Sequence, residues 1–388
     1  MDKTNRFYEI DLLRFFAALA VLMYHYTFLG YTTGDMAIKY SSFAPVSKYG
    51  FLGVNLFFII SGFVILNSAR NKSAKNFIIS RIVRLYPVFW ISCSLTFLVL
   101  VVIGGARFGH DFKVYLVNMT MLYKLFGVKP VDSVYWSLFY EMRFYFFIFM
   151  LLVFGKIEWM KTLLGLWLAA SYLFYAFAQN ELKYVGYFLM YNYSAYFIAG
   201  AVFFLIVLEG VDFYKLFLLF ASYLFSIFTV KEYLAYLTRH FQTHFSLYTV
   251  AACITLFFLV FYLISTNRTK AISYRKFAVL GLLTYPIYLL HQNIGFALFN
   301  IQHTYINKYA LLIIVILFIF LLSSLVHFKI EKVYAGRFRK MLEGFFGHIE
   351  NCIILIKKSF FRQAPEVTLK AEESCNPQYC EKMGRQDP

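Results

Sequence analysis

The chain has 388 residues, of which 61% are hydrophobic and 15% are charged, and its formal net charge is +17 at pH 7. An average soluble domain has about 25% charged residues, so this composition excludes an ordinary water-soluble fold and predicts an all-α integral membrane protein. The positive charge does not indicate nucleic-acid binding, because the cations lie in short loops and near the C-terminus, as the positive-inside bias predicts. The five cysteines show no pairing or zinc-binding pattern, so we expect neither a disulfide nor a metal site.

Apolar runs of about 20 residues predict a bundle of about ten transmembrane helices. Their expected limits are 9–29, 49–69, 85–104, 136–155, 161–179, 184–208, 213–230, 245–265, 277–299 and 309–328. Basic clusters near 70–84, 268–276 and 329–340 fall on one side when the N-terminus is cytoplasmic. We therefore expect both termini to be cytoplasmic. The opposite face should carry the loops near 30–48, 105–135, 231–244 and 300–308.

Three parts of the chain differ in composition. Residues 1–330 are expected to form the ten-helix membrane domain. Residues 331–362 mix Phe, Ile and Leu with Arg and Lys, which predicts an interfacial amphipathic helix. The alternative for this segment is a targeting or partner-binding role. Residues 363–388 have few apolar groups and are expected to be a disordered cytoplasmic tail. No internal repeat supports an inverted-repeat transporter.

The first span carries two polar side chains on one helical face. Arg14 and His25 are eleven residues apart, and eleven steps of about 100° return to within roughly 20° of the start. His25 should then lie roughly 16 Å beyond Arg14, near the middle of the hydrocarbon core, where an ionisable residue indicates a functional site. Asp11 is expected to pair with Arg14 at the cytoplasmic edge. Alternatively, Arg14 only anchors the helix and His25 only bonds a neighbouring helix.

The second and third spans carry weaker signals. In GVNLFFIISGF (53–63), Gly62 allows another backbone to approach closely and Ser61 places a hydroxyl in an apolar region, although helix packing alone explains small residues there. Arg81 and Arg84 share one helical face at the expected cytoplasmic entrance of the third span. Two guanidinium groups so placed suit phosphate, although positive charge there also orients a helix.

The fourth and ninth spans add an acid and a second histidine. The fourth opens with WSLFYE, in which Trp136 precedes Ser137 and Glu141, and the last two share a face. Arg143 points elsewhere, so Glu141 needs a partner from another helix, as a functional acid or as part of a structural network. In the ninth span Pro286 is expected to kink the helix and free a carbonyl. Its stripe of polar residues is Thr284, Tyr288 and His291, the last about mid-span and expected to face the cavity of His25.

Together and in this order, these segments resemble the acyltransferase 3 family of multi-pass bacterial membrane acyltransferases, which includes O-antigen, exopolysaccharide and Nod-factor O-acetyltransferases. The motifs that carry the resemblance are Arg14-x10-His25, GVNLFFIISGF, Arg81-x-x-Arg84, WSLFYE with Glu141, and Tyr288-x-x-His291, and the match covers about residues 7–330. Asn55 stands where the second-span motif frequently has an aspartate. Because we expect no SGNH-type esterase domain after the tenth span, the chain resembles the stand-alone subgroup.

The resemblance implies transfer of an acyl group, usually acetyl, from cytoplasmic acyl-CoA to a hydroxyl of a cell-surface or secreted glycan, such as a lipopolysaccharide or an exopolysaccharide. The enzyme would lie in the bacterial cytoplasmic (inner) membrane. His25 matches the essential histidine of the family, and Arg14, Arg81 and Arg84 match the residues that engage the CoA end. Acetyl-CoA is then a co-substrate, no cofactor is bound permanently, and the partners are membrane lipid and a glycan or lipid-linked glycan acceptor.

As a mechanism, we expect the CoA arm to bring the thioester to His25, which acts as general base on the acceptor hydroxyl or as a transient acyl carrier. Glu141 is the second candidate catalytic residue, because Glu141 or Tyr288 would orient the imidazole or stabilise the oxyanion. The candidate acceptor or oxyanion site consists of Ser61, Trp136, Ser137, Tyr288 and His291. The alternative from another class is a proton-coupled transporter or flippase of a glycan or small metabolite. A scaffold in a glycan assembly complex is a third possibility and would tolerate loss of His25.

Overall fold

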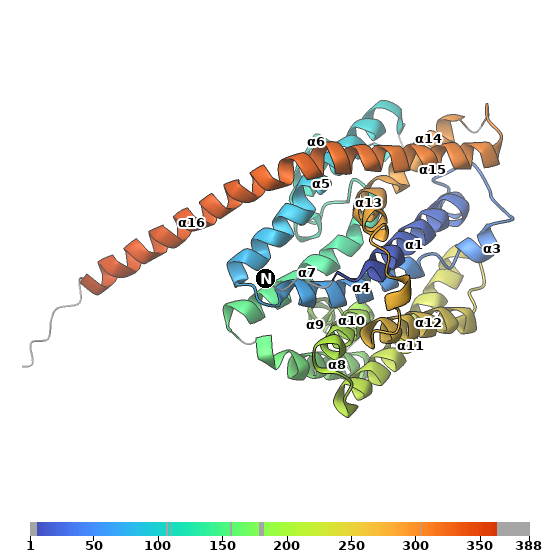
Figure 1. The fold of residues 1–388 in the computed structure, drawn as a ribbon. Helices are drawn as coiled ribbons and strands as arrows, with labels where there is room; N and C mark the ends of the chain where they lie inside the picture. The colour runs from blue at the N-terminus through green and yellow to red at the C-terminus, as the bar shows by residue number, and fades with distance from the viewer. Residues whose placement is uncertain are drawn as a thin grey trace, which may run out of the picture. The chain divides into compact units, whose positions relative to one another are not determined.

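The computed structural model describes residues 6–105, 108–109, 111–155, 157–177, 182–302 and 304–362. All regular secondary structure within these ranges is helical (Figure 1), which confirms the predicted all-α fold. Contacts between Cα atoms divide the chain into Met1–Lys340, which contains the candidate site, and Met341–Pro388. The segment 363–388, which was expected to be disordered, lies outside the described residues.

The elements are helices joined by short connections. In the first half of the chain they are α1 (Tyr8–Tyr24), the π-helical turn η1 (His25–Leu29), α2 (Gly30–Thr32), α3 (Ala44–Ser47), α4 (Leu52–Ala69), α5 (Ala74–Ile103), α6 (Phe112–Asn118), η3 (Tyr123–Phe126), η4 (Ser133–Tyr135), α7 (Trp136–Val153), η5 (Ile157–Trp159) and α8 (Met160–Phe177). In the second half they are α9 (Lys183–Leu189), α10 (Tyr191–Glu209), α11 (Phe213–Phe241), α12 (Leu247–Ser265), η6 (Lys270–Ile272), α13 (Phe277–Leu290), α14 (Gln292–Gln302), α15 (Lys308–Leu325), the π-helical segment η7 (Val326–Glu331) and α16 (Lys332–Arg362).

Nine helical segments in the described part of the chain are long and apolar enough to cross a membrane, as a multi-pass membrane protein requires. The predicted ninth span, 277–299, is not one straight helix. α13 ends at Leu290, the chain bends at His291, and α14 begins at Gln292. The break therefore falls five residues after Pro286, which lies inside α13.

Two predicted boundaries are wrong, and both errors have the same cause. α5 begins at Ala74 and not at residue 85, so Arg81 and Arg84 lie within the helix instead of before it. α11 continues to Phe241, beyond the predicted end at 230, so most of the predicted loop 231–244 is helical. Both extensions are polar turns that continue a helix past its apolar part, and a criterion based on apolar runs does not detect them.

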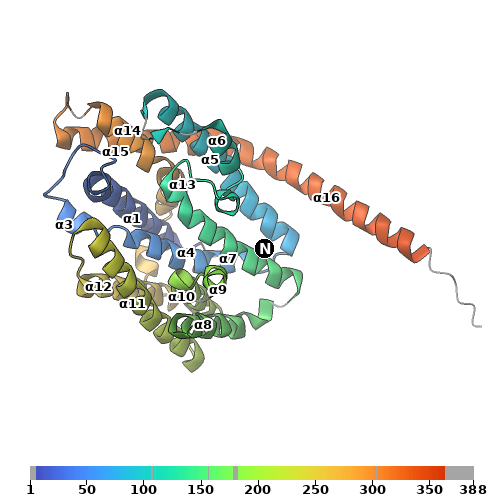
Figure 2. The ribbon, with the colours of Figure 1, turned by 180° about the vertical axis from the view of Figure 1, so that it is seen from behind.

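Helices α4 and α10 pack backbone to backbone, and they lie side by side in both views (Figures 1 and 2). A Cβ atom added at Gly62 of α4 would lie 2.1 Å from the carbonyl oxygen of Phe197. One added at Gly200 of α10 would lie 1.9 Å from the carbonyl oxygen of Ile59. Small residues allow this close approach in membranes, where the hydrophobic effect does not drive helices together. The expectation for Gly62 from the sequence is thus confirmed.

Helix α1 lies against α4 and α13. A Cβ atom at Gly53 of α4 would lie 2.5 Å from the carbonyl oxygen of Ala17, and one at Gly281 of α13 would lie 2.2 Å from the Asp11 carboxylate. Two more glycines thus bring α1 close to both neighbours. Because α1 carries His25 just after its C-terminal end and α13 is followed directly by His291, this packing brings the two histidines together.

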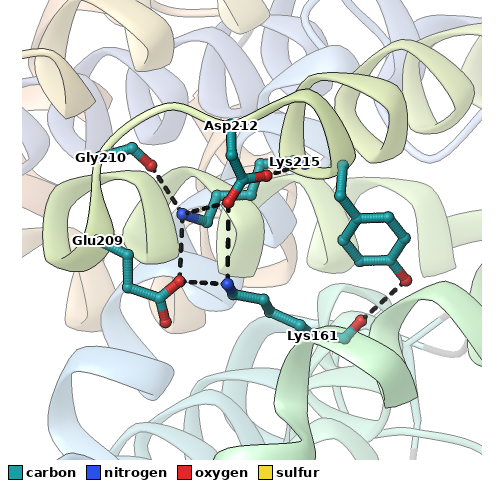
Figure 3. Close-up of polar contacts among 6 residues, drawn as sticks. Lys161, Glu209, Gly210, Asp212 and Lys215 are labelled. Carbon is teal, nitrogen blue, oxygen red and sulfur yellow. Dashed lines mark hydrogen bonds and ion pairs between the residues drawn. The ribbon is translucent and has the colours of Figure 1, made fainter.

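A cluster of four charged side chains ties α8, α10 and α11 (Figure 3). Nζ of Lys215 is buried and lies 2.9 Å from the carboxylate of Asp212 and 3.1 Å from that of Glu209. Nζ of Lys161 lies 2.6 Å from Glu209. The backbone N–H and the ammonium group of Lys215 hold the pKa of Asp212 below its ordinary value. Two cations and two carboxylates balance here, so the buried ammonium is paired and the cluster is structural.

The alanine variant Gly62→Ala should destabilise the bundle, because its methyl group would overlap the Phe197 carbonyl. Overpacking of this kind typically costs about 1–3 kcal/mol. The thermal unfolding midpoint of the purified protein in detergent should therefore fall. The matched control is Gly336→Ala, since a Cβ at Gly336 meets no heavy atom within 4 Å. Equal midpoints for Gly62→Ala and the wild type would contradict the close contact.

Candidate active site

Three cavities follow one another through the bundle, and neighbouring cavities share lining residues. The basic vestibule, about 370 Å³, is lined by the starts of α1, α5 and α13 and the end of α4. The middle cavity, about 90 Å³, shares three arginines with it. The histidine chamber, about 440 Å³, contains His25 and shares Val54 and Tyr288 with the middle cavity. The chamber is lined by the end of α1 and the starts of α4, α7 and α10, so it lies at the opposite end of α1 and α4 from the vestibule.

The basic vestibule gathers six cations around one acid among the described residues. The cations are Arg6, Arg14, Arg70, Lys72, Arg81 and Arg84. The acid is Asp11, whose carboxylate lies 2.8 Å from Nε of Arg6 and 3.7 Å from Nη1 of Arg14. The structure thus brings Asp11 and Arg14 together, and it adds Arg6, which no spacing had indicated. Burial and the neighbouring Arg81 hold the pKa of Lys72 below its ordinary value. The excess of positive charge suits a polyanionic ligand.

Arg14, Arg81 and Arg84 line both the vestibule and the middle cavity. Arg81 is nearly buried, its Nη2 donates to the Ser68 hydroxyl at 2.9 Å, and its guanidinium lies over the ring of Tyr145. These contacts fix its head group without neutralising it. A guanidinium held in this way is prepared to bind a phosphate with two parallel N–H donors.

Glu141 lies in the middle cavity, on the side of the arginines. Its carboxylate accepts a hydrogen bond from Ser61 of α4 at 3.0 Å and another from Tyr145, one turn further along α7. Ser61 is thus the partner from another helix that the sequence required. Arg143 lies over the rings of Tyr140 and Tyr187, so it does not pair with Glu141. His25 is not among the hydrogen-bond partners of Glu141, so this acid does not orient the imidazole in this structure.

Tyr288 separates the middle cavity from the histidine chamber, and it lines both. Its phenol lies 2.7 Å from the Ser137 hydroxyl and donates to the carbonyl oxygen of Val134 at 3.1 Å. Thr284, one turn earlier, lines the middle cavity. The predicted stripe on α13 therefore runs along the cavities, with Tyr288 at the point where they meet.

His25 and His291 lie side by side, one in the π-helical turn η1 and the other at the break between α13 and α14. Nδ1 of His25 is 2.7 Å from the carbonyl oxygen of Val21, and Nδ1 of His291 is 2.9 Å from that of Tyr288. A carbonyl oxygen only accepts, so these bonds assign the proton of each neutral ring to Nδ1. Nε2 of His291, 3.2 Å from Nδ1 of His25, then accepts from the same N–H. Nε2 of His25 keeps its lone pair.

The histidine chamber has an aromatic and polar lining in which few groups were predicted. Besides His25, Trp136 and Tyr288, it is lined by Tyr24, Asn55, Ser133, Asn192, Tyr193, Tyr196, Glu232, Tyr233, Tyr236, His240 and Gln292. Nε2 of Gln292 donates to the Ser133 hydroxyl, whereas the buried Oε1 has no hydrogen-bond partner among the described residues. A buried acceptor without a partner is costly, and this one belongs to a residue that lines the chamber.

A buried aspartate that the sequence did not indicate holds the break after α13. Asp132 accepts hydrogen bonds from the backbone N–H of Asn293 at 3.0 Å and of Val134 at 3.2 Å. The Asn293 amide donates to the carbonyl oxygen of Val131 at 2.9 Å. Burial raises the pKa of Asp132 to about 7, against the effect of the two N–H donors. This network fixes the chain directly after His291. Its partners are 161 residues apart, so no local pattern could reveal it.

The structure gathers the predicted site residues into two groups. The residues that line the vestibule or the middle cavity are Asp11, Arg14, Ser61, Arg81, Arg84, Ser137, Glu141 and Tyr288. Those at the chamber are His25, Trp136 and Tyr288, with His291 in contact with His25. His25 and Glu141 therefore lie in different cavities, and the group that contacts His25 is the second histidine.

These features define a multi-pass, all-α membrane protein with a buried polar site that is connected through shared cavity walls to a basic mouth. Residues 7–329 match the acyltransferase domain family called acyltransferase 3, so the chain belongs to this family. It is 29% identical over 167 residues to Nodulation protein 10 of Rhizobium leguminosarum bv. viciae. The matched region is 37% of this chain and 44% of that protein. The chain thus matches less than half of the length of this relative.

A second relative covers more of the chain. It is "Putative acetyltransferase ORF330" of the Acidianus two-tailed virus, 26% identical over 299 residues, which is 73% of this chain and 82% of that protein. No solved structure matches the chain.

The pKa of Asp132 makes the stability of the protein depend on pH in a specific direction. Because the folded value of about 7 lies above the ordinary 3.8, the folded protein keeps a proton that the unfolded chain loses between about pH 4 and pH 7. The contribution of Asp132 to the free energy of unfolding therefore falls as the pH rises through this window. Asp132→Asn lacks this decline. The difference between its thermal unfolding midpoint and that of the wild type should therefore shift in favour of the variant as the pH rises toward 7.

Thermal midpoints of both proteins in detergent, measured from about pH 4 to about pH 8, test this expectation. The matched control is Asp111→Asn, since Asp111 is an exposed aspartate that also accepts from a backbone N–H, that of Lys113. A constant difference between wild type and Asp132→Asn across the range would refute the assignment.

Proposed function

We propose that the protein transfers an acyl group, most simply acetyl, from acyl-CoA at the cytoplasmic face to a hydroxyl of a cell-surface or secreted glycan. One observation carries this proposal: the order of the cavities. Six cations surround the vestibule at one end of the bundle, and a buried histidine with a free Nε2 lines the chamber at the other. A donor with phosphates at one end and a thioester at the other matches this order.

The donor would bind with its phosphates in the vestibule. Arg81 and Arg84 are the candidate phosphate ligands. Arg14, which lines the same two cavities, is a third candidate. The middle cavity is much smaller than the other two, so it suits the thin pantetheine arm and not the nucleotide. The arm would have to pass Tyr288 to bring its thioester to His25, which requires the phenol to leave Ser137 and Val134.

At the thioester, His25 would act as general base. Nε2 takes the proton of the acceptor hydroxyl as its oxygen attacks the thioester carbonyl carbon. The tetrahedral intermediate then breaks its C–S bond, and the thiolate leaves with the proton from Nε2, so that CoA is released as a thiol. His291 would hold the imidazole in the required tautomer, since its Nε2 accepts from Nδ1 of His25. This is direct transfer, without an acyl-enzyme.

The other predicted residues divide between charge balance and oxyanion binding. Glu141 lines the same cavity as the three arginines, so its carboxylate would offset part of their positive charge. Its hydrogen bonds would also hold Ser61 and Tyr145 in place. Tyr288 carries a hydroxyl between the two cavities and is the candidate donor to the oxyanion.

The acceptor would enter the histidine chamber from the opposite face of the membrane. Its aromatic walls offer flat apolar surfaces to sugar rings, and Oε1 of Gln292 is free to accept from a sugar hydroxyl. Acetyl as the acyl group is supported by the name of the viral relative. With both termini in the cytoplasm, as the loop charges predict, the chain would lie in the cytoplasmic membrane of a bacterium.

Replacing His25 should abolish transfer. His25→Ala removes the base, which typically contributes about 10²- to 10⁴-fold to the rate. Cells that carry this variant should lack the acylated glycan found with the wild type, as measured by mass spectrometry of surface and secreted glycans. The control is His244→Ala, because His244 is exposed and lies outside the three cavities. Normal acylation by a folded His25→Ala protein would exclude this role and favour a scaffold.

A transporter would behave differently from a transferase in purified form. Protein in liposomes with acetyl-CoA should release free CoA thiol in the presence of the glycan, and His25→Ala should not. If the wild type instead moved a glycan or metabolite across the liposome membrane without acyl-CoA and released no CoA, the proposed reaction would be wrong.

Arg84→Gln should weaken donor binding more than it slows the transfer step. Loss of a charge-assisted hydrogen bond is worth about 1.5–3 kcal/mol, so the KM for acetyl-CoA should rise about ten-fold or more while kcat changes less. Arg84→Lys should restore part of the affinity. Lys270→Gln is the control, since Lys270 is an exposed cation outside the vestibule. An unchanged KM with a reduced kcat would place Arg84 outside the donor site.

A further inference from the structure

A groove lies between α7, α8 and α9, separate from the three site cavities. Its volume is about 970 Å³, and it shares no lining residue with the vestibule, the middle cavity or the chamber. The walls are apolar side chains such as Phe146, Leu166, Trp167 and Phe188. The one charged side chain among its described lining residues is Arg143. Nε1 of Trp167 donates to the carbonyl oxygen of Leu189 at 2.8 Å, which links two of these walls.

Arg143 is poorly satisfied in this position. Its guanidinium lies 4.3 Å from the ring centroids of both Tyr140 and Tyr187, and Nη1 donates to the carbonyl oxygen of Tyr187. Nε and Nη2 are buried and have no hydrogen-bond partner among the described residues. A buried donor without a partner is costly, and a charged one more so. The site therefore lacks an acceptor that a ligand would supply.

A second cation stands beside it. Nζ of Lys124, in η3, lies 5.5 Å from the ring centroid of Tyr140 and 5.8 Å from that of Phe139, and Arg143 covers the same two rings. Burial and the neighbouring Arg143 hold the pKa of Lys124 below its ordinary value. Within the described residues no carboxylate forms an ion pair with either cation. Two like charges thus lie over the ring of Phe139, which lines the groove, and neither has a counterion among the described residues.

An amphiphilic anion satisfies both halves of this site. The apolar walls gain contact with hydrocarbon chains, and the two cations gain a phosphate that supplies the missing acceptors. A free phosphate would make no hydrocarbon contact with the apolar walls of the groove. A neutral lipid would leave the two cations unpaired. We propose that this groove binds an anionic phospholipid of the membrane, with its phosphate on Arg143 and Lys124 and its acyl chains along α7 and α8.

The proposed lipid site lies next to the histidine chamber, but the lipid proposal does not depend on the proposed acyl transfer. The ring of Tyr140, which Arg143 covers, also contacts Trp136 and Tyr193, and both of these line the chamber. One aromatic layer therefore separates the lipid headgroup from the chamber. The lipid site would exist whichever group the enzyme transfers, so its test does not use activity.

The test is native mass spectrometry of the full-length protein titrated with phosphatidylglycerol. Removal of one charge-assisted contact should weaken binding about ten-fold or more, so Arg143→Gln and Lys124→Gln should each retain much less lipid than the wild type. Lys129→Gln is the matched control, because Lys129 is an exposed cation of the same connection between α6 and α7. It should bind lipid as the wild type does. Phosphatidylcholine and inorganic phosphate are the other two titrants.

Each outcome decides the proposal. Selective loss of phosphatidylglycerol in the two variants, with weak phosphatidylcholine binding throughout, supports it. Equal retention in the wild type and both variants overturns it, as does equal binding of phosphatidylcholine by the wild type. Saturable binding of inorganic phosphate that blocks the lipid would identify a free anion as the ligand and also overturn it. If Arg143→Gln does not fold, Lys124→Gln decides alone, since Lys124 lies in a connection outside the long helices.

Discussion

Two backbone carbonyls determine the chemistry available at the centre of this protein. Within a membrane each polar group must find its partner inside the protein, and the carbonyl oxygens of Val21 and Tyr288 accept hydrogen bonds from Nδ1 of His25 and of His291. A carboxylate in the same place would also fix the tautomer, but it would add a charge in a region of low dielectric. The pair of neutral rings avoids that charge and still leaves Nε2 of His25 as a base.

These bonds depend on two irregular turns of helix. The first is the π-helical turn η1, which begins at His25 directly after α1. The second is the bend at His291, between α13 and α14. Each irregularity is held by distant residues: Tyr26 donates to the carbonyl oxygen of His291 at 2.6 Å, and Asp132 binds the backbone of Asn293. Deviations from regular helix often occur at functional sites, and here they bring one ring nitrogen to the wall of a cavity.

The sequence predicted what depends on local periodicity and missed what depends on distant contacts. The face shared by Arg14 and His25, and the face shared by Arg81 and Arg84, follow from helix geometry alone. The start of α5 and the length of α11 were wrong, because polar turns continue these helices beyond their apolar parts. The contacts of Asp132 with Asn293 and of Gln292 with Ser133 could not be predicted, since the partners in each pair are more than a hundred residues apart in the sequence.

The arrangement of cations distinguishes structural from ligand-binding charge in this fold. Lys215 is buried, yet two carboxylates and a carbonyl surround its ammonium, so nothing is left for a ligand to satisfy. Arg81 is held by a serine hydroxyl and aromatic rings, which orient a guanidinium but do not neutralise it. Arg143 is held by a backbone carbonyl and two tyrosine rings, which likewise leave its charge unpaired. A membrane protein can keep a cation unpaired only at a cost, so the stacked arginines, and not the paired lysine, are where anionic ligands should bind.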